Sequence, residues 1–202
     1  MPFYDSTRAA IDGDTLYAEN VVSDGETVDA LAADRMEYEA AVLQNCRFTD
    51  GSLQRASFYN GALTDCTFVD CTFQDGYFRQ CTFTRCRFDG CKLGACHFKA
   101  CAFTDCSLAY ADLSHAVAET SRFERCVLRS AALSDMRLKS ARFTDCDLRE
   151  ADFFRTRLKG VDLSTCRIEG MTVSDTFMEL HGALISPSQA VDLVTLLGVR
   201  FV

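Results

Sequence analysis

The sequence predicts an all-β solenoid of stacked parallel coils, and three regularities carry this prediction. From Ala41 onward the chain divides into 27 consecutive five-residue units without an insertion. The third residue of a unit is Leu or Phe in 24 of the 27 units and is apolar in the others. All 12 cysteines fall at the first position of a unit. A fixed period of this kind is typical of repeat architectures, in which each unit buries its apolar residues only against its neighbours.

A longer period of 20 residues predicts how many units make one coil. Residues 20 apart share their character, as in the column Phe83, Phe103, Phe123 and Phe143. The cysteines at positions 46, 66, 86, 106, 126, 146 and 166 form a second unbroken column. Stacked rings favour each other by ~0.5–1.5 kcal/mol per pair beyond their burial. Four units per coil, with successive coils about 4.8 Å apart like parallel strands, explain this columnar order.

The repeating pattern of a small residue, a polar residue, Leu or Phe, and two further polar residues resembles that of the pentapeptide-repeat family. The resemblance covers 135 of the 202 residues, from Ala41 to Asp175. It implies a right-handed quadrilateral parallel β-helix, a pentapeptide-repeat solenoid. It also implies that the first and third residues of each unit point inward and that the other three point outward.

The chain is expected to divide into three parts. Residues 1–35 form an N-terminal cap or degenerate first coils, residues 36–180 form the β-helix, and residues 181–202 form a C-terminal module. In this module, Ser186 and Pro187 predict the start of a helix, with Gln189 at the capping-box position. The helix is expected to end at Gly198, and residues 199–202 alternate like a short strand.

The C-terminal module has two interpretations. A terminal coil needs a cover, because its open edge would otherwise recruit other chains, so the module caps the rod. The helix-then-strand ending also resembles the C-terminal module of pentapeptide proteins that protect DNA topoisomerases, and this resemblance implies a tail-to-tail homodimer. The candidate dimerisation residues are Val191, Val194, Leu197 and Phe201.

The sequence predicts no catalytic residue, no cofactor and no metal site, and therefore no enzyme. The three histidines lie at outward positions or beyond the coils, away from any outward nucleophile. The cysteines are spaced in multiples of five, unlike the close pairs that bind zinc, so we expect buried, reduced thiols. No signal peptide and no run of ~18 apolar residues is apparent, so we expect a cytoplasmic protein without membrane contact.

The outer surface is the expected functional region. The net charge is −8, and residues 1–40 alone hold ten acids and two bases, whereas the repeats are almost neutral. The family resemblance implies a DNA-mimicking protein that binds bacterial DNA gyrase or topoisomerase IV, confers fluoroquinolone resistance and does not bind nucleic acid directly. An acidic surface would suit a groove that binds DNA electrostatically. The candidate contact residues are Asp145, Asp147, Glu150, Asp152, Tyr59 and Tyr77.

Other interpretations remain open at this point. Asp65, Arg85, Asp105 and Arg125 alternate in one column, which equally fits a solvated surface of weak ion pairs. The protein could instead be an interaction scaffold with an unidentified protein partner. A third hypothesis is a redox or metal-storing protein that uses its thiols. Fold alone does not decide among these functions.

Overall fold

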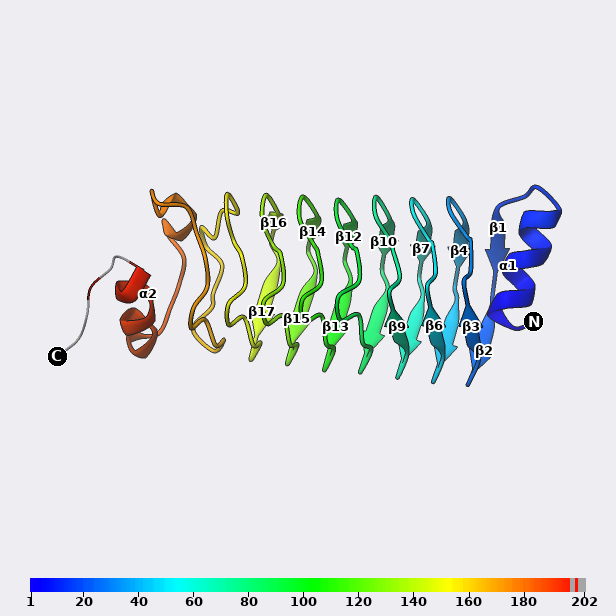
Figure 1. The fold of residues 1–202 in the computed structure, drawn as a ribbon, viewed down its shortest axis with the longest axis horizontal. Helices are drawn as coiled ribbons and strands as arrows, with labels where there is room; N and C mark the ends of the chain where they lie inside the picture. The colour runs from blue at the N-terminus through cyan, green and yellow to red at the C-terminus, as the bar shows by residue number, and fades with distance from the viewer. Residues whose placement is uncertain (197–198, 200–202) are drawn as a thin grey trace.

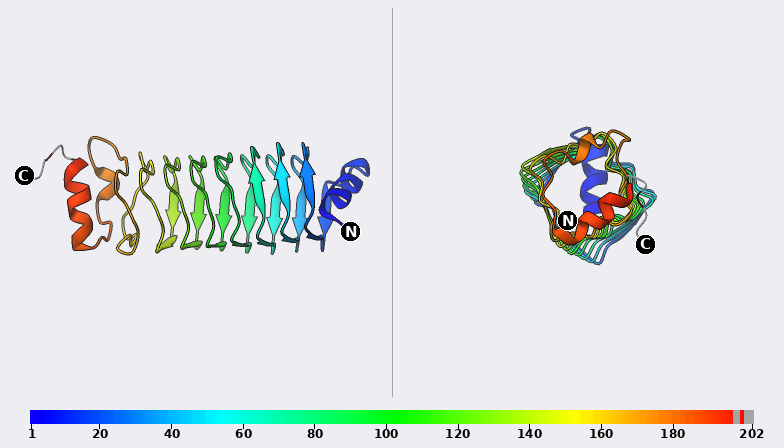
Figure 2. Two further views of the ribbon diagram at one scale, coloured as in Figure 1. Left: turned by 60° about the horizontal axis from the view of Figure 1, so that its bottom comes forward. Right: turned by 90° about the vertical axis from the view of Figure 1, so that its left-hand side faces the viewer.

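The protein is a straight, four-sided rod built as a right-handed parallel β-helix (Figure 1). The structure, a computed structural model, describes residues 1–196 and residue 199. Viewed along the rod, the coils superimpose as a square frame (Figure 2). A helix covers the N-terminal end, and a short helical module covers the opposite end. This architecture confirms the fold class that the five-residue period predicts.

Three parallel sheets form three sides of the rod, each strand pairing with the strand 20 residues away. The first sheet contains β1 (Tyr17–Glu19), β4 (Glu37–Glu39), β7 (Ser57–Tyr59), β10 (Tyr77–Arg79), β12 (His97–Lys99), β14 (Val117–Glu119) and β16 (Arg137–Lys139). The second contains β2 (Val22–Asp24), β5 (Val42–Gln44), β8 (Ala62–Thr64), β11 (Thr82–Thr84), β13 (Ala102–Thr104), β15 (Arg122–Glu124) and β17 (Arg142–Thr144). The third contains β3 (Thr27–Asp29), β6 (Arg47–Thr49) and β9 (Thr67–Val69), and isolated bridges continue it and complete the fourth side.

The five-residue frame extends upstream of Ala41. Ala18 pairs with Tyr38 and Ser23 pairs with Leu43 in the same 20-residue register as the later coils. The regular coil therefore begins at about Leu16, where the carbonyl oxygen accepts the backbone N–H of Glu37 at 2.8 Å. The sequence pattern hides this part because small or polar residues occupy third positions that hold Leu or Phe elsewhere.

The corners of the coils depend on the fifth residue of each unit. This residue adopts a positive φ at nearly every corner, for example 53° at Asn45, 54° at Asp65 and 69° at Gly90. Left-handed backbone is least costly for Gly, Asn and Asp, which explains their frequency at this position. The corner turns the chain while the third residue continues to point inward.

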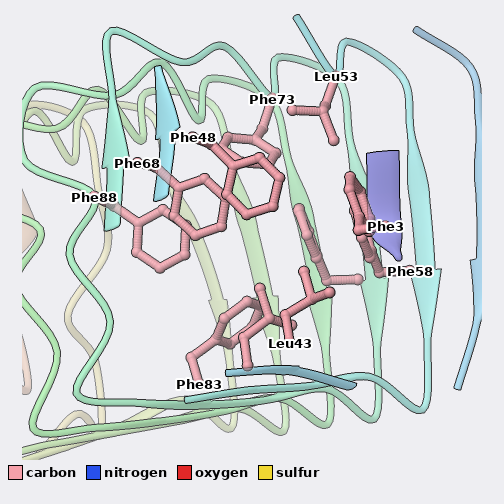
Figure 3. A pocket seen from close by; sticks show the side chains of 11 residues that line it. Phe3, Leu43, Phe48, Leu53, Phe58, Phe68, Phe73, Phe83 and Phe88 are labelled. Carbon is pink, nitrogen blue, oxygen red and sulfur yellow. The ribbon is translucent and has the colours of Figure 1, made fainter. Parts of the chain in front are cut away.

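The interior is a set of stacked side-chain columns (Figure 3). Phe83 and Phe103 stack with their ring centroids 4.4 Å apart, and Phe103 and Phe123 stack at 4.8 Å. Neighbouring columns meet edge to face, as do Phe98 and Phe103 at 5.4 Å. The void lined by Phe83, Phe98 and Phe103 measures about 10 Å³, and so does the void nearer the N-terminal end that Figure 3 shows. A single water molecule needs ~10–15 Å³, so side chains fill the rod.

Helix α1 (Phe3–Asp12) closes the N-terminal end, where the sequence pattern predicts only turns or a loose cap. Phe3 is buried and stacks on Tyr38 with ring centroids 4.9 Å apart. The first backbone N–H groups of the helix are held by Glu26, whose carboxylate accepts from Phe3 at 2.9 Å and from Tyr4 at 3.0 Å. A carboxylate at this position satisfies orphan donors and complements the helix dipole.

The C-terminal module contains η1 (Met178–Leu180), η2 (Pro187–Gln189) and α2 (Ala190–Leu196). The predicted helix start at Ser186 is confirmed, because Gln189 accepts the Ser186 backbone N–H at 2.7 Å. The Gln189 amide also donates to the carbonyls of Leu163 at 2.8 Å and Cys166 at 2.6 Å. The predicted helix end at Gly198 and nearly all of the predicted strand over residues 199–202 lie outside the described residues.

The ladder between coils opens near the C-terminal end of the rod. From residue 37 to residue 172, every fifth residue donates its backbone N–H to the carbonyl 21 positions earlier, except Arg157 and Asp162. Residues 158–163 keep only their forward bonds, with Leu158 donating to Glu179 at 2.9 Å and Leu163 to Leu184 at 2.8 Å. The next side stays closed, because Arg167 donates to Cys146 at 2.9 Å. We call the opening between residues 137–144 and 157–164 the open seam.

Candidate partner-binding surface

Groups capable of catalysis do not converge in the described part of the chain. His97 lies 3.5 Å from Glu119, and His115 lies 4.0 Å from Asp135, on separate outward positions of the coils. Within residues 1–196, no cluster of three potential metal ligands is found. No helix among the described residues is long and apolar enough to cross a membrane. The chemistry that the described surface offers is therefore charge, hydrogen bonding and aromatic contact.

All 12 cysteines are free and buried. Their thiols point into the rod and contact backbone carbonyls of the preceding coil, as Cys96 does with Phe73 at 3.0 Å. Burial raises the pKa of the Cys91 and Cys96 thiols to about 12. The thiolate is the reactive form, so thiols of this kind are poor nucleophiles at neutral pH.

The four acidic contact candidates lie on one coil but do not form one patch. They are spread over three consecutive sides of that coil, and most are already engaged. Asp147 accepts the Arg149 Nε at 2.7 Å, and Glu150 accepts Arg129 and Ser130 at 2.8 Å each. Asp152 accepts the backbone N–H of Phe154 at 2.9 Å, and the Asp145 backbone donates to Thr165 at 2.9 Å. Bases within the coils thus offset the charge of Asp147 and Glu150.

The predicted ion-pair column is present on the second sheet side. Arg85 binds Asp65 with two contacts of 2.7 Å, and Arg125 binds Asp105 at 2.7 and 3.1 Å. The hydrogen bonds from Arg85 hold the pKa of Asp65 below its usual range. Alternating signs on successive coils therefore neutralise each other along this column.

The first two coils carry acids whose charge is not offset in this way. Their outward side chains bond to neutral groups of the next coil: Asp24 accepts from Asn45 at 2.7 Å and Glu39 from Asn60 at 2.7 Å. None of these acids forms an ion pair within the described residues. We call this set the N-terminal acidic surface, which surrounds the end of the rod and comprises Glu19, Glu37 and Glu39 on the first sheet side, Asp24 on the second, Asp29 on the third and Asp34 on the fourth. The excess of acids among residues 1–40 indicates this surface in the sequence, although no contact role was predicted for these residues.

The two tyrosine candidates lie together on the first sheet. Tyr59 and Tyr77 stand on adjacent coils with ring centroids 5.8 Å apart, and both are half-buried. Tyr59 donates to Glu37 at 3.4 Å, and the Tyr77 ring meets His97 edge to face at 5.2 Å. This aromatic strip therefore begins beside the N-terminal acidic surface.

The described dimerisation candidates lie on α2. Val191 is 50% exposed, Val194 is half-buried, and Leu193 and Leu196 pack against the core. The helix thus covers the last coil with one face and presents Val191 on the other. The remaining candidates, Leu197 and Phe201, lie outside the described residues.

Comparison with protein families gives two matches. The model of the pentapeptide repeat region matches residues 76–153. The model of pentapeptide repeats in nine copies matches residues 38–92. Together they span residues 38–153, which is more than half of the chain. No curated protein sequence matches the chain significantly.

One solved structure shares the fold, and two further solved structures are less similar. A trypsin-treated form of QnrB1, a plasmid-mediated fluoroquinolone resistance protein, has a TM-score of 0.64 and 17% identity, covering 92% of this chain and 98% of that one. Full-length QnrB1 has a TM-score of 0.45 and 16% identity, covering 91% and 100%. HetL, a pentapeptide repeat protein involved in heterocyst differentiation regulation from the cyanobacterium Nostoc, has a TM-score of 0.27 and 12% identity, covering 87% and 94%.

Proposed function

Because this chain belongs to the pentapeptide-repeat family, we propose that it is a non-enzymatic binding protein that modulates bacterial DNA gyrase or topoisomerase IV by imitating duplex DNA. The observation that carries the proposal is the N-terminal acidic surface at one end of a straight rod. The shared fold with a fluoroquinolone resistance protein, along nearly the whole of both chains, supports it. We infer that the protein acts in the cytoplasm and gives fluoroquinolone resistance through this contact.

The physical basis of the mimicry is electrostatic. Duplex DNA carries one negative charge per ~1.7 Å of its axis, and proteins that bind it line their grooves with bases. Acids whose charge is not offset by a neighbouring base attract a basic groove of this kind toward the rod. The N-terminal acidic surface meets this requirement, because its bonds go to neutral amides and hydroxyls. The strip of Tyr59 and Tyr77 supplies adjoining aromatic contacts of the kind found at interface centres.

A supercoiling assay with purified gyrase, with and without a fluoroquinolone, tests the proposal. We expect inhibition at micromolar protein or rescue from the drug. Replacing Glu19, Asp24, Glu37 and Glu39 by Lys should abolish the effect. The matched control reverses the sequence candidates Asp145, Asp147, Glu150 and Asp152, and it should weaken the effect less. Absence of any effect of the wild-type protein on gyrase or topoisomerase IV contradicts the proposal.

A second candidate function is that of an interaction scaffold for another protein partner. The observation that favours it is the open seam, because an unfinished sheet edge is a site that can pair with another chain. This candidate does not require a topoisomerase.

A further inference from the structure

The open seam leaves backbone groups of two coils without their usual partners. On one rim are the carbonyls of Met136 and Ala141, which would otherwise accept from Arg157 and Asp162. Within the described residues, no hydrogen bond joins the N–H groups of Leu138, Ser140 or Phe143 to the following coil. Buried backbone groups are nearly always paired, so an edge of alternating donors and acceptors can take up a further strand.

Like charges face each other across the first sheet side of the seam. In the 20-residue register, Arg137 stands opposite Arg157, and Lys139 stands opposite Lys159. All four side chains are exposed, and none is in an ion pair within residues 1–196. Like charges directly opposite each other do not support strand pairing, so these four bases add nothing that would close the ladder here. The two basic rows would attract a row of negative charges.

The seam also has space and an apolar floor. A groove of about 500 Å³ opens beside β17, lined by residues that include Ala141, Phe143, Gly160 and Asp162. Its volume lies within the ~300–1,000 Å³ typical of ligand sites. On the adjoining first sheet side, Leu138 is only half-buried, whereas Leu158 is fully buried. An inward apolar side chain entering the seam would therefore find exposed apolar surface to cover.

We propose that the open seam binds an extended acidic segment of a partner protein, which adds a parallel strand between β16–β17 and residues 157–164. Its backbone would satisfy the open donors and acceptors of both rims. Its outward carboxylates would lie between Arg137 and Arg157 and between Lys139 and Lys159. The result is an alternation of charge like that of Asp65, Arg85, Asp105 and Arg125 on the neighbouring side.

The backbone pattern favours a peptide over a nucleic acid strand as the occupant. Phosphate groups only accept hydrogen bonds, so they could use the basic side chains but not the free carbonyls of Met136 and Ala141. A polypeptide offers donors and acceptors in alternation, as strand addition requires. The site lies on coils distant from the N-terminal acidic surface, and it stands or falls independently of any topoisomerase contact (Figure 1).

Fluorescence polarisation with a labelled synthetic peptide tests the site. The probe, Ala-Glu-Leu-Glu-Gly-Ala-Thr-Leu-Thr-Gly, places Glu outward and Leu inward in the pentad pattern. A matched peptide carries Lys in place of Glu. We expect the full-length protein to bind the Glu peptide at least about tenfold more tightly than the Lys peptide, because like-charge contacts cost several kcal/mol. The preference should fall as salt rises.

A charge swap makes the test specific to the seam. Lys139→Glu with Lys159→Glu should abolish most of the preference, because Arg137 and Arg157 still favour Glu at one outward row whereas the two replaced positions favour Lys at the other. Arg47→Glu with Arg55→Glu makes the same charge change at exposed positions on other coils and should leave the preference unchanged. Hydrogen exchange should show the amides of Leu138 and Phe143 exchanging faster than those of Ala118 and Phe123, and the Glu peptide should slow them.

Several results would overturn the proposal. One is the absence of binding to the Glu peptide, and another is equal affinity for both peptides. A third is an unchanged preference in the charge-swapped variant. Seam amides that are as protected as their counterparts without peptide would mean that the edge is already occupied. Single-stranded DNA that binds through the same four bases and displaces the Glu peptide would identify an electrostatic nucleic-acid site instead.

Discussion

At the scale of single residues, position within the five-residue unit decides what each side chain does. Inward Leu, Phe and Cys side chains fill the columns, and outward side chains meet water or the next coil. Phe103 is 2% exposed and contacts rings on both sides along its column. Phe154, at an outward position, is 43% exposed, and the Arg155 guanidinium lies 5.4 Å from its ring centroid. The same residue type therefore has opposite energetic roles at these two positions.

This contrast gives a mutational prediction. Phe103→Ala should lower the free energy of unfolding by about 3–5 kcal/mol, because it leaves a cavity in a filled column. Phe154→Ala should lower it by about 1 kcal/mol or less, since only an exposed cation–π contact is lost. Chemical denaturation of both variants measures the difference. Similar losses in the two variants would contradict the assignment of inward and outward positions.

At the scale of elements, a polar side chain at each end of the rod joins the terminal helical segment to the coils, half-buried Glu26 at one end and buried Glu179 at the other. At the N-terminal end, Glu26 accepts from the first N–H groups of α1. At the C-terminal end, the buried Glu179 carboxylate accepts the Arg155 backbone N–H and the Ser174 hydroxyl at 2.8 Å each. Arg155 is where the coil-to-coil ladder gives way to the C-terminal module. Glu179 therefore joins the module to the rod.

Acid should loosen this junction. Burial alone would raise the pKa of Glu179, but hydrogen bonds from its own backbone, Ser174 and Arg155 together hold that pKa below its usual value. A carboxyl with a lowered folded-state pKa stabilises the fold above the unfolded value of about 4.3, and this contribution is lost as pH falls below it. Glu179→Gln should therefore cost about 1–3 kcal/mol at neutral pH, and the difference should shrink in acid.

Unfolding of the Glu179→Gln variant by denaturant, followed between neutral pH and pH values below about 4, measures this dependence. Glu169→Gln is the matched control, because Glu169 is exposed and its nearest base, Arg167, lies at 3.8 Å. A constant difference between wild type and Glu179→Gln across this range would show that the charge of Glu179 does not stabilise the junction.

At the scale of the whole molecule, charge is distributed unevenly along the rod. The first sheet side begins with Glu19, Glu37 and Glu39 and ends with a basic group made of Arg137, Lys139, Arg157 and Lys159. Such a distribution orients partners, because each end attracts the opposite charge. We propose that the two ends serve different contacts, a DNA-binding groove at the acidic end and an acidic peptide at the basic end.

The proposed tail-to-tail homodimer belongs to this scale as well. Val191 presents an exposed apolar side chain at the end of the rod, which suits a self-complementary contact. Light scattering at micromolar concentration should give the mass of a dimer for the wild type and of a monomer for Val191→Asp. Val22→Asp, at an exposed valine near the other end, should remain dimeric. A monomeric wild type would contradict the proposal.

The repeating part of this protein can be predicted from its residues alone. A short period with only two inward positions allows one solution, because each unit must bury Leu, Phe or Cys against the coils above and below. The column of Phe103 and the ion pairs of Arg85 and Arg125 follow directly from the 20-residue spacing. The helix start at Ser186 was also predictable, since capping residues act locally.

Other features depend on contacts that do not repeat along the chain, and these features become visible only in the folded protein. Helix α1 packs on Tyr38 and is capped by Glu26, and the repeat pattern does not predict those contacts. Asp147 and Glu150 form ion pairs with bases that the coil geometry brings close, whereas the acids of the N-terminal acidic surface form none within the described residues. The open seam lies where Arg157 and Asp162 lack the usual bonds to the preceding coil while residues 158–163 bond to the C-terminal module. A pattern of residue types cannot show where a ladder stops.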